Sequence, residues 1–480
     1  MSEKSLSQNA LFNVIYKCLN VFFPLVTMVY VSRVLLPESV GKVASAQNII
    51  SYFVIIASLG LPTYGVKKIA EFRDDREKCG KVFSELFTIN SISTVLCSFF
   101  YIMMLFSFDF FHSKIAISFV VGLQLFANII NIDWLYQGYE EYRYIMFRSL
   151  IVKLLALASV FIFVHDSSDY IVYALITALS LVTNFVFNVG HMHKYVKISF
   201  KDLCIQRHVK PILTLLAASI AIEIYTLCST TFLSIFKGDE TVAFFTNSVK
   251  AVSITRTMIA SVCAVFLPRL NYYIGQNRIE DFNNLATKGI RLLLSMSVPV
   301  AIILALMADD FVLLLFGSEY NASVLSMQIL SISVITVAIS NFMGYQILVS
   351  IGKERIVLYS TIIAAVINIL LNILLIGPLG HNGAAIASVI SEAAVSLYQL
   401  HYVSKCIPLK FSRDTTLSIL LPAAFMFCIM ILLKLLNMST YIEVIVVSIT
   451  GLLSYAIIGR LLNNEAVTIV LKKLYHKKSK

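Results

Sequence analysis

The stretch from Thr241 to Leu270, TVAFFTNSVKAVSITRTMIASVCAVFLPRL, decides how the rest of this sequence is interpreted. It is long and apolar enough for a helix that crosses a bilayer, yet it contains Lys250 and Arg256. At about 1.5 Å per residue, these cations lie roughly 14 and 22 Å from the start of the helix, inside a hydrocarbon layer about 30 Å thick. A charge at that depth is costly unless it faces a cavity or a partner. The stretch therefore predicts a functional membrane helix, the alternative being snorkelling or ion-paired structural cations.

The composition of the 480-residue chain is that of a membrane protein. Hydrophobic residues make up 58% of the sequence and charged residues 14%, and the mean hydropathy is +0.84. A soluble protein would carry about a quarter charged residues. We therefore expect an all-α integral membrane protein with about fourteen transmembrane helices. The expected spans lie near residues 8–32, 41–64, 84–107, 115–136, 146–164, 169–190, 211–236, 241–266, 291–316, 323–349, 356–377, 382–404, 415–436 and 441–461.

Basic residues are distributed unevenly about these spans. If the N-terminus is cytoplasmic, 29 of the 38 Lys and Arg residues lie on the inner side. Five lie at outer ends or in outer loops: Arg33, Lys42, Lys114, Lys237 and Lys434. Because positively charged loops stay in the cytoplasm, this distribution predicts that both termini are inside. The net charge of +11 then reflects topology and attraction to anionic lipid, and not nucleic-acid binding.

The sequence also indicates an internal duplication. Leu61-Pro62 ends the second span, and Leu267-Pro268 ends the eighth, 206 residues later. The same shift carries the first six spans close to spans seven to twelve, and duplicated halves with a site between them are typical of transporters. We therefore expect two pseudo-symmetric lobes. The expected parts are a six-helix lobe at 1–190, a cytoplasmic loop at 191–210, a second six-helix lobe at 211–410, and two further helices with a basic tail at 411–480.

Polar residues inside or beside the spans are the candidates for ligand binding. The expected ligand-binding set consists of Lys17, Arg33, Lys42, Gln47, Lys250 and Arg256. Since cations bind phosphate oxygens strongly, this set favours an anionic ligand between the lobes. Three carboxylates are candidates for binding a coupling ion, H⁺ or Na⁺, or for pairing with buried cations: Glu223, Asp133 and Glu392. The eight cysteines include no CxxC pair or metal-ligand spacing, so we expect free thiols, no metal and no cofactor.

Two runs in the first four spans carry a resemblance to a known family. The run from Asp133 to Glu140, DWLYQGYE, resembles the D-W-x-x-Q-G-x-E signature of Wzx-type O-antigen and capsule repeat-unit flippases. The run from Arg33 to Gly41, RVLLPESVG, is similar to the R-x-L-x-P-E-x-x-G turn of that family. Lys67 stands where many relatives have Arg, which keeps the charge but loses the planar fork. Similarity to the wider superfamily of polysaccharide, multidrug and lipid II exporters rests on Asn368, Asn372, the 383–385 run GAA and Glu392.

The resemblance and the cations together imply a flippase. It would move a polyprenyl-pyrophosphate-linked oligosaccharide repeat unit, of O-antigen or capsule type, across the bacterial plasma membrane by alternating access. The implied partners are an undecaprenyl-type lipid-linked oligosaccharide and the bilayer, with a polysaccharide polymerase and assembly proteins as further candidates.

Three alternatives are weaker. A multidrug or cation antiporter of the same superfamily would need an acidic or aromatic cavity, whereas the buried set here is cationic. A lipid II flippase shares the cationic site, but the signature beginning at Asp133 argues against it. A polysaccharide polymerase would need a large outer loop, whereas the longest loops here face inward, so we do not expect an enzyme.

The charge distribution predicts a topology that reporter fusions can check. Fusions at Lys480 and within the 191–210 loop should report a cytoplasmic position, and a fusion at Gly238 should report the outer side, because the basic residues concentrate on one face. An outer position for Lys480 would overturn this topology.

Overall fold

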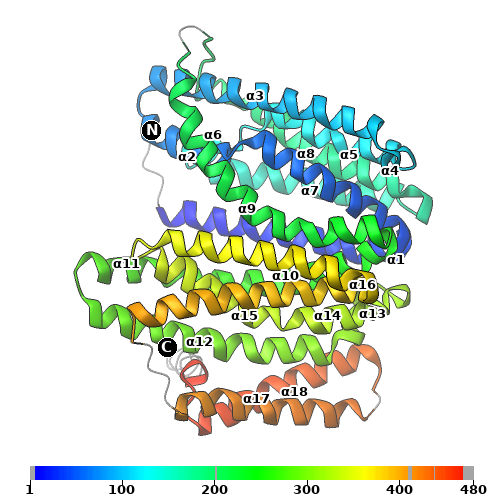
Figure 1. Cartoon of the computed structure of the whole chain (residues 1–480), viewed down its shortest axis with the longest axis vertical. Coiled ribbons are helices and arrows are strands. Elements are labelled where there is room, and N and C mark those ends of the chain that lie inside the picture. The colour runs from blue at the N-terminus through cyan, green and yellow to red at the C-terminus, as the bar shows by residue number, and fades with distance from the viewer. Residues whose placement is uncertain (1–5, 201–202, 409–412, 437, 469–480) are drawn as a thin grey trace. The chain divides into compact units, whose positions relative to one another are not determined.

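The structure is a computed structural model that describes residues 6–200, 203–408, 413–436 and 438–468. These residues form helices joined by short turns, and no strand occurs among them (Figure 1). The all-α fold expected from composition is therefore confirmed. Helices predominate because a backbone inside hydrocarbon must satisfy its hydrogen bonds within its own segment.

The chain divides into two compact units, Met1–Leu227 with Gly238–Ala243, and Cys228–Lys237 with Phe244–Lys480. The first unit contains α1 (Leu6–Ser58), α2 (Leu61–Phe72), α3 (Arg76–Ser107), α4 (Asp109–His112), α5 (Ile115–Ala127), η1 (Asn128–Ile130), α6 (Asp133–Gly138), α7 (Tyr142–Phe163), η2 (Ser167–Asp169) and α8 (Tyr170–Met192). The chain passes between the units in α9 (Gln206–Phe236) and α10 (Asp239–Ala264). The second unit continues with α11 (Leu267–Gly275), α12 (Ile279–Leu306), α13 (Ala308–Leu315), η3 (Ser318–Tyr320), α14 (Ser323–Ser331), α15 (Ser333–Asn341), η4 (Phe342–Leu348), α16 (Glu354–Cys406), α17 (Arg413–Lys434) and α18 (Thr440–Leu461).

Each of the fourteen expected spans has a helical counterpart. Ten helical segments among the described residues are long and apolar enough to cross a membrane. Phe22–Phe72 covers the end of the first expected span and all of the second, and Glu354–Cys406 covers the eleventh and twelfth. The shorter apolar segments Ile115–Ile130 and Thr226–Phe236 correspond to the fourth and seventh. Spans one and two are two helices that meet at a sharp kink at Leu36, and spans eleven and twelve are two helices that meet at a kink at Gly380.

The order of elements repeats at the spacing expected from the duplication. The short helix α2 follows the second span in the first half, and α11 follows the eighth span in the second half, and both begin at a Leu-Pro pair. Proline fits the first turn of a helix because the missing N–H would have no intrahelical partner there. The superposition of the two halves remains a prediction.

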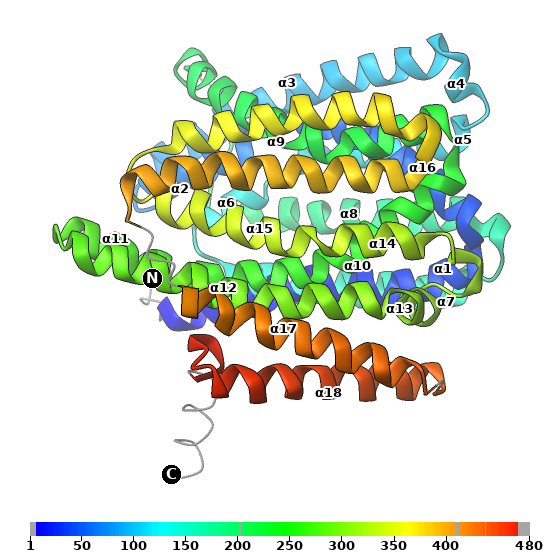
Figure 2. The same cartoon turned by 60° about the horizontal axis from the view of Figure 1, so that its bottom comes forward.

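The last two helices belong to the second unit. Helices α17 and α18 lie side by side (Figure 2), and they pack on the α12–α13 region through Met307, Met426, Met430 and Val447. Between α17 and α18, Gly451 of α18 packs against Met430 of α17, whose sulfur would lie 2.9 Å from an added Cβ.

The turn at Leu36 brings the start of α10 onto the first unit. Leu36 has φ 63° and ψ 166°, which breaks the helix before Pro37. An added Cβ on Gly41 would lie 1.7 Å from the backbone oxygen of Asp239. The Asp239 carboxylate accepts hydrogen bonds from Ser45 at 2.7 Å and from Lys114 at 2.6 Å. The glycine of the R-x-L-x-P-E-x-x-G turn is therefore required for close packing.

The segment expected as a loop at 191–210 packs on the first unit through several polar contacts. Ser199 N–H donates to Ser84 Oγ at 2.9 Å, and Cys204 N–H donates to Glu85 Oε1 at 2.8 Å. Glu85 is fully buried and also interacts with Arg207 and with His208, whose Nε2 lies 2.9 Å from Glu85 Oε2. The compact unit thus extends to Leu227, beyond the expected lobe boundary at residue 190.

Gly41 provides a direct test of this packing. Gly41→Ala should sharply reduce the amount of folded protein and its Tm, because the new Cβ meets backbone and no side chain can move aside. Thermal unfolding of the detergent-purified protein measures the effect. Gly190→Ala is the matched control, since nothing lies within 4 Å of its Cβ position. Equal stability of both variants would contradict the close approach of Asp239.

Candidate functional site

The two cations of α10 lie in the second unit. Lys250 is exposed and Arg256 is half-buried. Arg256 Nη2 donates a hydrogen bond to Ser333 Oγ at the start of α15, and Ser333 is itself fully buried. The guanidinium is therefore oriented by a neighbouring helix of the same unit. Both residues lie in the interior of α10, which runs from Asp239 to Ala264.

Two predicted binding residues of the first unit already have protein partners. Lys42 Nζ lies 2.7 Å from Glu38 Oε1 and 5.5 Å from the centre of the Tyr170 ring. Gln47 and Gln124 exchange two hydrogen bonds, of 2.9 and 2.8 Å. Because both polar ends of each amide are engaged in this exchange, the structure gives Gln47 a role in joining α1 to α5.

The other two candidates on α1 are Arg33 and Lys17. Arg33 is exposed, three residues before the break at Leu36. Lys17 belongs to α1, but its side chain lies outside the described residues.

Asp133 forms a buried charge pair. Its Oδ1 lies 3.0 Å from Arg148 Nη1 of α7 and accepts a 2.5 Å hydrogen bond from Asn188 Nδ2 of α8. Arg148 also donates to the side-chain oxygen of Asn188, and both Arg148 and Asn188 are buried. Breaking such a pair strands a charge in a medium that cannot solvate it. Of the two roles considered for Asp133, the geometry supports charge pairing.

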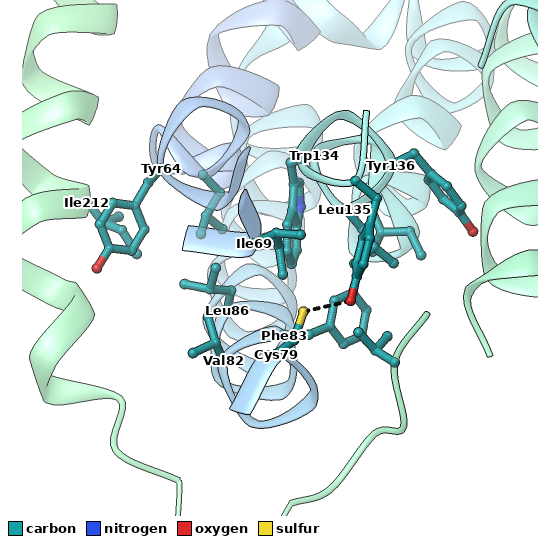
Figure 3. Packing of buried hydrophobic residues seen from close by; sticks show 14 of the residues in the cluster. Tyr64, Ile69, Cys79, Val82, Phe83, Leu86, Trp134, Leu135, Tyr136 and Ile212 are labelled. Carbon is teal, nitrogen blue, oxygen red and sulfur yellow. Dashed lines mark hydrogen bonds between the residues drawn. The ribbon is translucent and has the colours of Figure 1, made fainter. Parts of the chain in front are cut away.

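The rest of the D-W-x-x-Q-G-x-E run packs helix α6 against α2. Trp134 covers Gly65, where an added Cβ would lie 2.7 Å from the indole ring, and a Cβ on Gly138 would lie 2.6 Å from Ile69. Figure 3 shows Trp134 beside Ile69 within the buried cluster, which also contains a hydrogen bond from the Tyr139 hydroxyl to the Cys79 sulfur. The signature residues thus form a helix junction.

Glu140 completes this junction. It occupies a left-handed backbone position with φ 56°, and its Oε1 lies 3.0 Å from Arg73 Nη1 at the end of α2. Both side chains are exposed by more than 40%, so this ion pair adds little stability and mainly fixes the end of α2.

The two remaining carboxylate candidates are half-buried. Glu223 in α9 accepts a 3.1 Å hydrogen bond from the Thr226 hydroxyl, one turn along the same helix. Glu392 lies in the second half of α16, where Ser396 donates to its backbone carbonyl at 3.0 Å. No cluster of three or more His, Cys, Asp or Glu side chains with metal-binding geometry occurs in the part of the chain that the structure describes.

One cation was absent from the expected set. Lys153, in the middle of α7, donates a hydrogen bond to Asn20 Oδ1 of α1. A signal for it exists in the charge distribution: four of the 38 basic residues are in neither the inner nor the outer group, namely Lys17, Lys153, Lys250 and Arg256. Lys153 was not included in the expected set because the surrounding run, IVKLLALASVFIF, is otherwise strongly apolar.

Solved structures confirm the membrane-transporter fold. The chain superposes on an inward closed conformation of the lipid II flippase MurJ with a TM-score of 0.78, covering 94% of this chain and 98% of that protein at 14% identity. It also superposes on an inward-facing multidrug resistance MATE family transporter of the MOP superfamily with a TM-score of 0.66, covering 80% and 94% of the two chains at 17% identity.

Sequence comparison identifies the family. A protein of Escherichia coli (strain K12), whose name provisionally assigns it O-antigen transport, is 23% identical over 407 residues, which is 84% of this chain and 97% of that protein. The MatE family matches residues 211–374. The family described as polysaccharide biosynthesis protein matches residues 6–274. Since that match spans more than half of the chain, this multi-pass membrane protein belongs to the polysaccharide biosynthesis protein family.

Proposed function

We propose that this protein is a flippase that translocates a polyprenyl-pyrophosphate-linked oligosaccharide repeat unit, of O-antigen or capsule type, by alternating access. The membrane would be the bacterial plasma membrane, with both chain termini in the cytoplasm. Membership of the polysaccharide biosynthesis family and the name of the Escherichia coli relative support this substrate class.

The observation that carries the proposal is the pair of cations on α10. Lys250 and Arg256 lie in the interior of a helix that begins at Asp239 and ends at Ala264. A pyrophosphate carries several negative oxygens, and an anion of this kind can compensate cations that hydrocarbon cannot. Arg256 presents a planar fork suited to two phosphate oxygens, and its hydrogen bond to Ser333 fixes one arm of that fork.

The charge of these residues also distinguishes the proposal from drug export. A cationic drug would be repelled by Lys250 and Arg256, whereas an anionic lipid carrier would be attracted. The role proposed is transport, and not catalysis. An H⁺ or Na⁺ gradient would drive the cycle by favouring one conformation, with Glu223 as the candidate coupling group. Proteins of the polymerase and assembly machinery are the proposed partners.

Transport by reconstituted vesicles tests the proposal. Wild-type protein should move a fluorescent undecaprenyl-pyrophosphate-linked repeat unit between leaflets, measured by protection from an enzyme added outside. Arg256→Ala should lower the rate per folded molecule at least about tenfold, because one bidentate charge contact is lost, and Arg256→Lys should restore part of it.

The control for Arg256 is Arg278→Ala. Arg278 forms an exposed ion pair with Asp281, 2.7 Å away, whose loss should leave transport unchanged. A wild-type protein that moves no lipid-linked saccharide overturns the proposed function. A wild-type rate in Arg256→Ala instead removes Arg256 from the binding site.

A further inference from the structure

Lys153 lies at the depth where a charge is hardest to accommodate. It is the twelfth of the 22 residues of α7, so its Cα lies roughly 16 Å from either end of the helix. A lysine side chain is about 6 Å long and cannot reach an interface from this position by snorkelling. Its ammonium must therefore be stabilised at mid-depth.

The partner that Lys153 has in the structure is neutral. Its ammonium donates to Asn20 Oδ1 of α1, and no carboxylate of the described residues forms an ion pair with it. Arg148, five residues earlier on the same helix, differs because it pairs with Asp133 at 3.0 Å. One cation of α7 is compensated by protein and the other is not.

The Lys153–Asn20 pair is also accessible. Arg148 and Val152 lie on the buried face of α7, and Lys153 is half-buried at the edge of that face. Asn20 is exposed. While its Oδ1 accepts from Lys153 and its amide nitrogen donates one N–H to the Tyr16 side chain, a second N–H donor remains for another acceptor. An ammonium and an amide side by side can bind one anion together.

We propose that Lys153 and Asn20 form an anion-binding site of the first unit that holds the pyrophosphate of a polyprenyl-linked substrate. The inference deepens the proposed function and rests on it. It assigns a phosphate contact to Asn20 of α1 and Lys153 of α7, both within the first unit. A pyrophosphate would supply the negative charge that the protein does not supply to Lys153.

Binding of a short substrate analogue tests the site directly. Farnesyl diphosphate should raise the Tm of the purified wild-type protein, whereas farnesol, which has the same tail without the anion, should not. Inorganic pyrophosphate and phosphatidylglycerol show whether the anion alone or any anionic lipid suffices. If the site binds a lipid-linked pyrophosphate, farnesyl diphosphate should bind more tightly than either inorganic pyrophosphate or phosphatidylglycerol. Equally tight binding of inorganic pyrophosphate or of phosphatidylglycerol would overturn the assignment of this ligand.

Two substitutions separate binding from structural support. Lys153→Met should weaken farnesyl diphosphate binding about tenfold or more, and Lys153→Arg should retain most of it. Asn20→Asp should also weaken binding while keeping the protein folded, because its carboxylate would pair with Lys153 and replace the ligand anion. Lys78→Met is the control, since Lys78 forms an exposed pair with Asp75 in the same unit.

The possible results separate a failure of the proposed anion site from a failure of the proposed flippase function. If Asn20→Asp binds farnesyl diphosphate as tightly as wild type, or if folded Lys153→Met does, the site is wrong even when wild-type transport is intact. If wild-type protein binds farnesyl diphosphate at Lys153 but moves no lipid-linked saccharide, the flippase assignment fails and the anion site stands.

Discussion

The absence of water from the hydrocarbon layer is the constraint on which this structure depends. It requires backbone hydrogen bonds to close within each segment, which makes the described chain helical, and it requires every intramembrane charge to be stabilised by protein, a cavity or a ligand. Asp133, Arg148 and Asn188 satisfy the second requirement internally. Lys153 and Lys250 form no ion pair with the described carboxylates, and the proposals for an anionic ligand start from that difference.

The sequence predicted the fold well because hydropathy reports the bilayer directly. A run of about twenty apolar residues is sufficient to identify a span, and the two Leu-Pro pairs singled out in the sequence stand at the starts of α2 and α11. The breaks at Leu36 and Gly380 fall in the gaps expected between spans one and two and between spans eleven and twelve, although hydropathy alone does not give their backbone conformation.

The candidate site was predicted less completely because partners depend on packing between distant segments. Gln47 belonged to the expected ligand-binding set, but its amide is engaged by Gln124, 77 residues away in the sequence. Arg148 was counted with the inner loops, although its charge is buried against Asp133. Lys153 was overlooked because a single lysine barely changes the hydropathy of its run. The motif residues Trp134 and Gly138 were recognised as a signature, but their packing role required the positions of Gly65 and Ile69.

The chain passes from the first unit to the second within α9 and again within α10, and this bears on how such a chain could have arisen. If two copies of a gene were fused, the simplest junction would leave each copy self-contained. Here the 191–210 segment and α9 as far as Leu227 pack with the first unit, and the start of α10 returns to it at Asp239. A separately made second half would therefore lack the surface on which its leading helix folds. If the chain arose by such a fusion, this mutual dependence would make the fusion hard to reverse.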